Sequence, residues 1–100
     1  MKAASRGGVQ DDKLQALEDL RADVKPRLTP GLSISRDNPG RTPPAWSVRD
    51  LGGKAVLTFG LIDRTYFWSW DNGDSNHYTK DTEMMRTVIL SELVRFRHIA

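Results

Sequence analysis

The chain has 100 residues, of which 38% are hydrophobic and 28% are charged, and its formal net charge is +2. These values fit one globular domain and exclude a low-complexity or strongly charged disordered chain. The chain contains no cysteine, which excludes disulfides, thiolate nucleophiles and cysteine-bound zinc. No apolar run approaches the roughly 20 residues needed to cross a bilayer, so we expect a soluble cytoplasmic protein without membrane contact.

The N-terminal quarter predicts a tail followed by a helix. Residues 1–9 are small and polar, and we expect a disordered tail there, before a single domain over residues 10–100. Asp11 and Asp12 suit a helix N-terminus, and Pro26 suits its end. Between them, apolar residues recur at three- and four-residue steps: Leu14, Leu17, Leu20 and Val24. This pattern predicts an amphipathic helix.

Four segments then show strand patterns, separated by turn signals. The predicted strands are residues 32–36, 45–51, 54–62 and 64–71. Proline, glycine, asparagine and aspartate punctuate them, with a Pro-rich loop over residues 37–44 and the turns Gly52-Gly53, Asp63-Arg64 and Asn72-Gly73. The pattern is typical of an antiparallel meander.

The last predicted strand holds two of the three tryptophans. Period two places Tyr66, Trp68 and Trp70 on one face and Phe67 on the other. If the helices cover the Phe67 face, the tryptophan face is exposed and marks a binding surface. Because two tryptophans and a tyrosine carry more apolar area than Phe67, Thr65 and Ser69, the core interpretation is favoured.

The C-terminal third predicts a second amphipathic helix. Residues 74–78 are too polar to assign and fit either a short fifth strand or a loop. Thr79 is the predicted N-cap, with Asp81 and Glu83 at the positive end of the helix dipole. The apolar stripe consists of Met85, Val88, Ile89, Leu93 and Phe96.

These elements predict an α+β fold. We expect a four-stranded antiparallel meander sheet with an N-terminal and a C-terminal amphipathic helix packed on one face, as a two-layer sandwich. The element order, the Pro44–Val48 segment and the Tyr66–Trp70 segment together resemble a recurring kind of small, uncharacterised actinobacterial α+β protein with a Trp-rich strand. The resemblance covers residues 11–97 and implies the fold, without an activity.

No catalytic or metal motif is present. Residues 72–83 alternate oxygen ligands as a calcium loop does, but the first is Asn72 and the sixth is His77 where glycine is needed. His77 lies near Asp71, Asp74 and Asp81, yet no nucleophile motif accompanies it. The solvated turn and helix cap explain the same residues. We predict no catalytic residues, no metal and no cofactor.

Two surfaces remain as binding candidates. Aromatic partner-binding candidates are Trp46, Tyr66, Trp68 and Trp70. Basic candidates for nucleic acid are Arg86, Arg95, Arg97 and His98, which are equally explained as a solvated helix end. We hypothesise a non-enzymatic module that binds a protein, including a second copy of itself. The alternative is a small nucleic-acid-binding protein, and the third is a small ligand-binding protein or enzyme.

A four-stranded meander leaves two unpaired edges, here residues 32–36 and the aromatic strand, unless residues 76–78 fold back over the latter. Thr65–Trp70 contains neither charge nor proline to discourage pairing. We therefore predict homodimer or heteromeric assembly through the edge of the aromatic strand.

Overall fold

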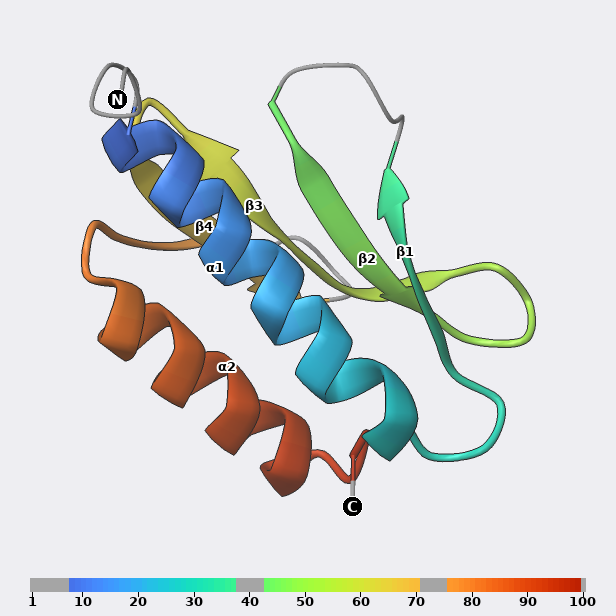
Figure 1. The fold of residues 1–100 in the computed structure, drawn as a ribbon. Helices are drawn as coiled ribbons and strands as arrows, with labels where there is room; N and C mark the ends of the chain where they lie inside the picture. The colour runs from blue at the N-terminus through green and yellow to red at the C-terminus, as the bar shows by residue number, and fades with distance from the viewer. Residues whose placement is uncertain (1–7, 38–42, 71–75, 100) are drawn as a thin grey trace.

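In the part of the chain that the structure describes, five antiparallel strands follow a first helix in sequence and precede a second, and both helices lie on one side of the sheet (Figure 1). The computed structural model describes residues 8–37, 43–70 and 76–99. The helices are α1 (Gly8–Val24) and α2 (Thr82–Arg95), and a short 3-10 turn (Lys25–Arg27) follows α1. The strands are β1 (Ser33–Asp37), β2 (Ala45–Arg49), β3 (Ala55–Ile62), β4 (Thr65–Trp70) and β5 (Asn76–Thr79). The predicted α+β class is confirmed.

The sheet has the strand order β1-β2-β3-β4-β5, so every strand pairs with its sequence neighbour. The predicted meander is confirmed. The predicted number of four strands is wrong, because a fifth strand, Asn76–Thr79, pairs with β4 along residues 66–69. Its polar sequence conceals a strand because the side chains of β5 are largely exposed, so they need no apolar alternation.

The fifth strand also overturns the predicted assembly through the aromatic strand. β4 pairs with β3 on one side and with β5 on the other, so its backbone offers no free edge. The edges of the sheet are β1, as predicted, and β5.

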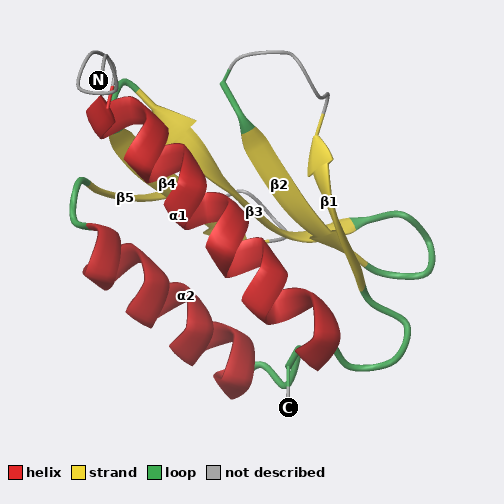
Figure 2. Cartoon of the chain, in the orientation of Figure 1, coloured by secondary structure: helices red, strands yellow, loops and turns green. Residues whose placement is uncertain are grey.

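One face of the sheet carries the large apolar side chains, and both helices lie on that side (Figure 2). From the sheet, the buried cluster contains Ile34, Trp46, Val48, Leu57, Phe59, Leu61, Tyr66 and Trp68. From the helices, it contains Leu17, Leu20, Val24, Met85, Ile89 and Leu93. Apolar area therefore decides which face of β4 is covered, as predicted, because burying indole and phenol rings removes the most apolar surface from water.

The helix ends follow their local chemistry with two differences from expectation. α1 ends at Val24, just before Pro26, as predicted, but it begins at Gly8 and so precedes the acidic pair. α2 is capped by Asp81, whose carboxylate accepts a hydrogen bond from the Met84 amide at 2.8 Å. The predicted cap, Thr79, belongs instead to β5, where it pairs with Tyr66. Residues 1–7 of the predicted tail, the loop residues 38–42 and the Asn72-Gly73 turn lie outside the described residues.

The two helices lie side by side and run in the same direction in Figure 1. The chain segments beyond their C-terminal ends then meet. The Thr29 amide donates a hydrogen bond to the His98 carbonyl at 2.9 Å, and Leu28 forms an isolated antiparallel bridge with Ile99. A clasp, formed by Leu28, Thr29, His98 and Ile99, thus joins the first third of the chain to its last residues.

Candidate partner-binding surface

Three of the four aromatic binding candidates are core residues. Trp46, Tyr66 and Trp68 are 1%, 0% and 4% exposed, so they present no surface to a partner in this fold. The helix residues that cover them are the apolar stripes of α1 and α2. Only Trp70, at the C-terminal end of β4, is partly exposed and partly packed on the core.

The buried rings form a row that crosses the sheet. Arg36 on β1 lies 5.2 Å from the centre of the Trp46 ring, and Trp46 stacks on Phe59 with centroids 6.0 Å apart. At the other edge, Trp68 stacks on His77 of β5 at 5.4 Å. His77, which in the sequence lies near several aspartates, therefore covers a core tryptophan. The row of rings thus ends at the Arg36 guanidinium on β1 and at the His77 imidazole on β5.

Tyr66 fixes the start of α2 against the sheet. Its hydroxyl lies 2.7 Å from the Thr82 hydroxyl, and the Lys13 ammonium lies 4.7 Å from the centre of its ring. Burial raises the pKa of Tyr66, the nearby Asp81 charge raises the pKa further, and the Thr82 hydrogen bond lowers it. The phenolate is therefore disfavoured in the folded state.

This raised pKa predicts an alkaline loss of stability. Because the folded pKa of Tyr66 lies above its unfolded value, its contribution is constant below about pH 10 and falls as pH rises above that value. Tyr66→Phe should lower stability at neutral pH by about 1 kcal/mol through loss of the Thr82 hydrogen bond. The deficit should shrink above about pH 10, measured by urea unfolding at each pH. A stability deficit of Tyr66→Phe that stays constant above about pH 10 would contradict a raised pKa of Tyr66.

A cluster of exposed and partly exposed rings lies at the end of α2. Phe96 is 47% exposed and packs edge-on against Trp70, with centroids 4.9 Å apart and ring planes at 75°. His98 stacks on the same indole at 6.0 Å, and the Arg95 guanidinium lies 5.7 Å from the centre of the Phe96 ring. We call these residues the C-terminal patch: Trp70, Arg95, Phe96, Arg97 and His98.

The geometry of the C-terminal patch depends on how α2 ends. The His98 amide donates to the Leu93 carbonyl at 2.8 Å, and the Arg97 amide donates to the Val94 carbonyl at 2.9 Å. This is a Schellman motif, which requires a left-handed residue where the helix stops, usually glycine. Here the residue is Arg97, with φ of 63°. A side chain at this position costs about 1–2 kcal/mol relative to relaxed backbone.

The basic candidates separate into two groups. Arg86 forms an ion pair with Asp23 of α1, so it bridges the two helices. Arg95, Arg97 and His98 lie together in the C-terminal patch, where a carboxylate is also present, because Glu92 accepts a hydrogen bond from the Trp70 indole N–H at 2.9 Å. The helical spacing predicted Phe96 as part of the apolar stripe of the helix. Its contact with Trp70 could not be predicted, because the two residues are 26 positions apart in the sequence and no local pattern links them.

The opposite face of the sheet is more polar. Ser47 donates a hydrogen bond to Asp37 at 2.6 Å and lies 2.9 Å from the Thr58 hydroxyl, while Arg49 pairs with Asp37 at 3.3 Å. These contacts tie β1, β2 and β3 together. Among the described residues, no group of three or more histidine, aspartate or glutamate side chains is arranged to hold a metal ion.

Comparisons with known proteins add no assignment: no protein-family model matches the chain, and neither does any curated protein or solved structure. Neither described helix is long and apolar enough to cross a membrane.

Proposed function

We propose that this chain is a non-enzymatic binding module that recognises a protein partner through the C-terminal patch. The observation that carries the proposal is the half-exposed Phe96 ring, held against Trp70 with the Arg95 guanidinium beside it. Tryptophan, tyrosine and arginine dominate the energetically important centres of protein interfaces, and phenylalanine is also enriched in interfaces. A ring fixed by packing also loses little conformational entropy on binding.

The left-handed backbone of Arg97 supports a functional reason for this residue. Glycine would adopt the same conformation without steric cost, and the chain instead places a charged side chain there. Non-glycine residues in this conformation are often found at sites where function offsets a loss of stability.

A protein partner is favoured over nucleic acid by two contacts. The carboxylate of Glu92 lies within the patch, where it would repel phosphate. Phe96 packs against the Trp70 ring in a T-shaped contact and His98 stacks on it, so bases would have little free indole surface on which to stack. The remaining basic candidate, Arg86, is occupied by Asp23.

Phe96→Ala tests the proposal in a capture experiment from nuclease-treated lysate of the source cells. We expect the wild-type chain to retain a specific protein and Phe96→Ala to lose it. The matched control is Tyr78→Ala, which removes a 63% exposed ring from β5, away from the patch, and should retain the partner. Partner retention by Phe96→Ala, or loss of binding on nuclease treatment alone, would contradict a protein partner at this patch.

Arg97→Gly provides a second, opposite readout. Relief of the left-handed side chain, less the backbone entropy that glycine loses on folding, should raise the free energy of unfolding by about 0.5–1 kcal/mol. The same change should weaken partner binding, because it removes one charge from the patch. Urea unfolding and quantitative capture measure the two effects separately. Unchanged binding would exclude Arg97 from the interface.

A further inference from the structure

We propose that a second copy of this chain docks antiparallel on the outward face of α2, forming a symmetric dimer. This surface adjoins the C-terminal patch, whose Arg95 and Arg97 supply charge at its end, and the inference goes beyond the proposed partner binding. It is defined by four exposed side chains, which we call the outward stripe: Met84, Thr87, Ser91 and Val94.

The outward stripe is unusual in its chemistry. Its four residues recur at steps of three, four and three, so they share one side of the helix, opposite the buried residues Met85, Ile89 and Leu93. A solvent-facing helix side normally carries charged residues, yet between Glu83 and Arg95 the exposed positions of α2 are these four, and none is charged. Met84 and Val94 are 54% and 50% exposed. In Figure 1, no other labelled element lies beyond the outer side of α2.

The stripe is complementary to itself when two copies meet head to tail. Its step pattern is that of a heptad seam, in which a and d positions alternate. Antiparallel pairing about the middle of α2 places Met84 opposite Val94 of the second copy. It also places Thr87 opposite Ser91, so two small side chains at the centre let the helices approach closely, as a helix seam requires.

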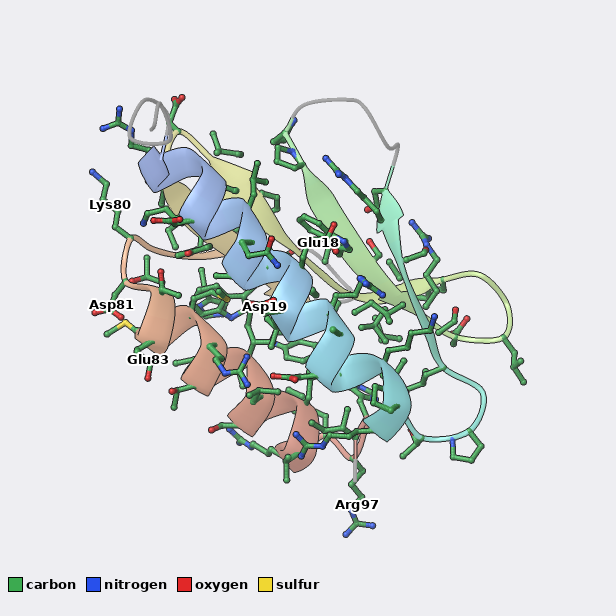
Figure 3. All side chains as sticks on the ribbon, in the orientation of Figure 1. Glu18, Asp19, Lys80, Asp81, Glu83 and Arg97 are labelled. Carbon is green, nitrogen blue, oxygen red and sulfur yellow. The ribbon has the colours of Figure 1, made fainter. Side chains whose placement is uncertain are left out.

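The charges at the two ends of α2 select the antiparallel arrangement. Asp81 and Glu83 lie at the start of the helix, and Arg95 and Arg97 lie at its end; Figure 3 shows the two acidic residues far from Arg97. Lys80, beside the acidic end, offsets one of its two negative charges. Antiparallel copies bring the acidic end of one helix beside the basic end of the other, whereas parallel copies would bring like charges together.

The size of the stripe sets the expected affinity. A helix of 14 residues is about 21 Å long, so two such helices bury less than the standard interface of about 1,600 Å². We expect a dissociation constant on the order of micromolar or weaker. Light scattering over a micromolar-to-millimolar concentration series should show a reversible rise from monomer to dimer mass. A strict monomer throughout the series would overturn the proposal.

Charge at the centre of the seam should abolish this dimer. Thr87→Glu should weaken self-association at least about tenfold without unfolding the chain, because Thr87 is exposed and lies on the side of α2 opposite its buried residues. The matched control is Ala22→Glu, which adds the same charge to an exposed position of α1. Equal weakening by both variants would mean that net charge, rather than the stripe, controls association.

The absence of cysteine in the chain permits a direct test of direction. Single-cysteine chains Met84→Cys and Val94→Cys, mixed and oxidised, should form a disulfide-linked heterodimer. Each variant alone should remain mostly uncrosslinked, because like positions lie at opposite ends of an antiparallel seam. Efficient linkage of each variant to itself would overturn the antiparallel arrangement.

A charge swap tests the same arrangement. Glu83→Arg should weaken the dimer, because it places like charges together, and adding Arg95→Glu should restore the dimer.

Discussion

Trp68→Ala is expected to cost about 3–5 kcal/mol of folding free energy, which is a large part of the about 5–15 kcal/mol that a domain of this size possesses. Trp68 is 4% exposed and pairs with Phe59 on β3 and with His77 on β5. Its removal leaves a cavity between the sheet and the helices, between Phe59 and His77 in the row of rings. We expect a largely unfolded or insoluble variant, measured by far-ultraviolet circular dichroism during urea titration.

Two further variants make this expectation specific. Tyr78→Ala removes a ring from the neighbouring strand, but because that ring is 63% exposed, the cost should stay below about 1 kcal/mol. Trp68→Phe should cost much less than Trp68→Ala, because the buried indole N–H has no hydrogen-bond partner among the described residues and its loss carries no penalty. A folded Trp68→Ala protein with near-normal stability would contradict the core assignment.

Gly60→Ala is the second large expected effect, at about 2–3 kcal/mol. A Cβ atom at this position would lie 2.3 Å from the Pro44 carbonyl oxygen and 2.7 Å from the Phe67 ring. That oxygen also accepts a hydrogen bond from the Leu61 amide at 3.1 Å, so it cannot retreat without breaking the bond. The Phe67 ring covers Gly60 across the β3–β4 pair, which explains the need for glycine inside a strand.

Gly52→Ala is the matched control for this site. Its added Cβ would meet only the Asp50 carboxylate oxygen, at 3.4 Å, and the cost should stay within about 0.5 kcal/mol. Combining Gly60→Ala with Phe67→Ala should recover only part of the loss, because the Pro44 clash remains. The stabilities of the wild type, Gly52→Ala, Gly60→Ala and the double variant are compared by thermal unfolding. Equal stability of Gly52→Ala and Gly60→Ala would refute the steric explanation.

Periodicity and ring area were sufficient to predict most of the fold. Tyr66 and Trp68 lie on the buried face because they carry more apolar area than Phe67, and α1 ends where Pro26 requires. β5 could not be assigned from its sequence, because its stability comes from backbone pairing with β4 rather than from an apolar pattern of its own. Because β5 pairs with β4, the aromatic strand is not at the edge of the sheet, and the predicted assembly through that edge is wrong.

The candidate surfaces were less accessible to sequence reasoning. Phe96 follows the helical spacing of a core residue, yet the chain leaves α2 at this point and turns the ring onto Trp70. Arg86 and Arg95 looked equivalent in sequence, but a partner on another helix, Asp23, distinguishes them. Both distinctions depend on contacts between segments far apart in the chain, which local pattern does not encode.

The clasp between Thr29 and His98 has a consequence for the order of folding. Every strand pairing joins neighbours in the chain and closes only a short loop, at a small entropic cost. The clasp instead closes a loop that contains the whole sheet and α2, so its contacts should form last and open first. His98 belongs to both the clasp and the C-terminal patch, so the patch loses its shape whenever the clasp opens, while the sheet remains intact.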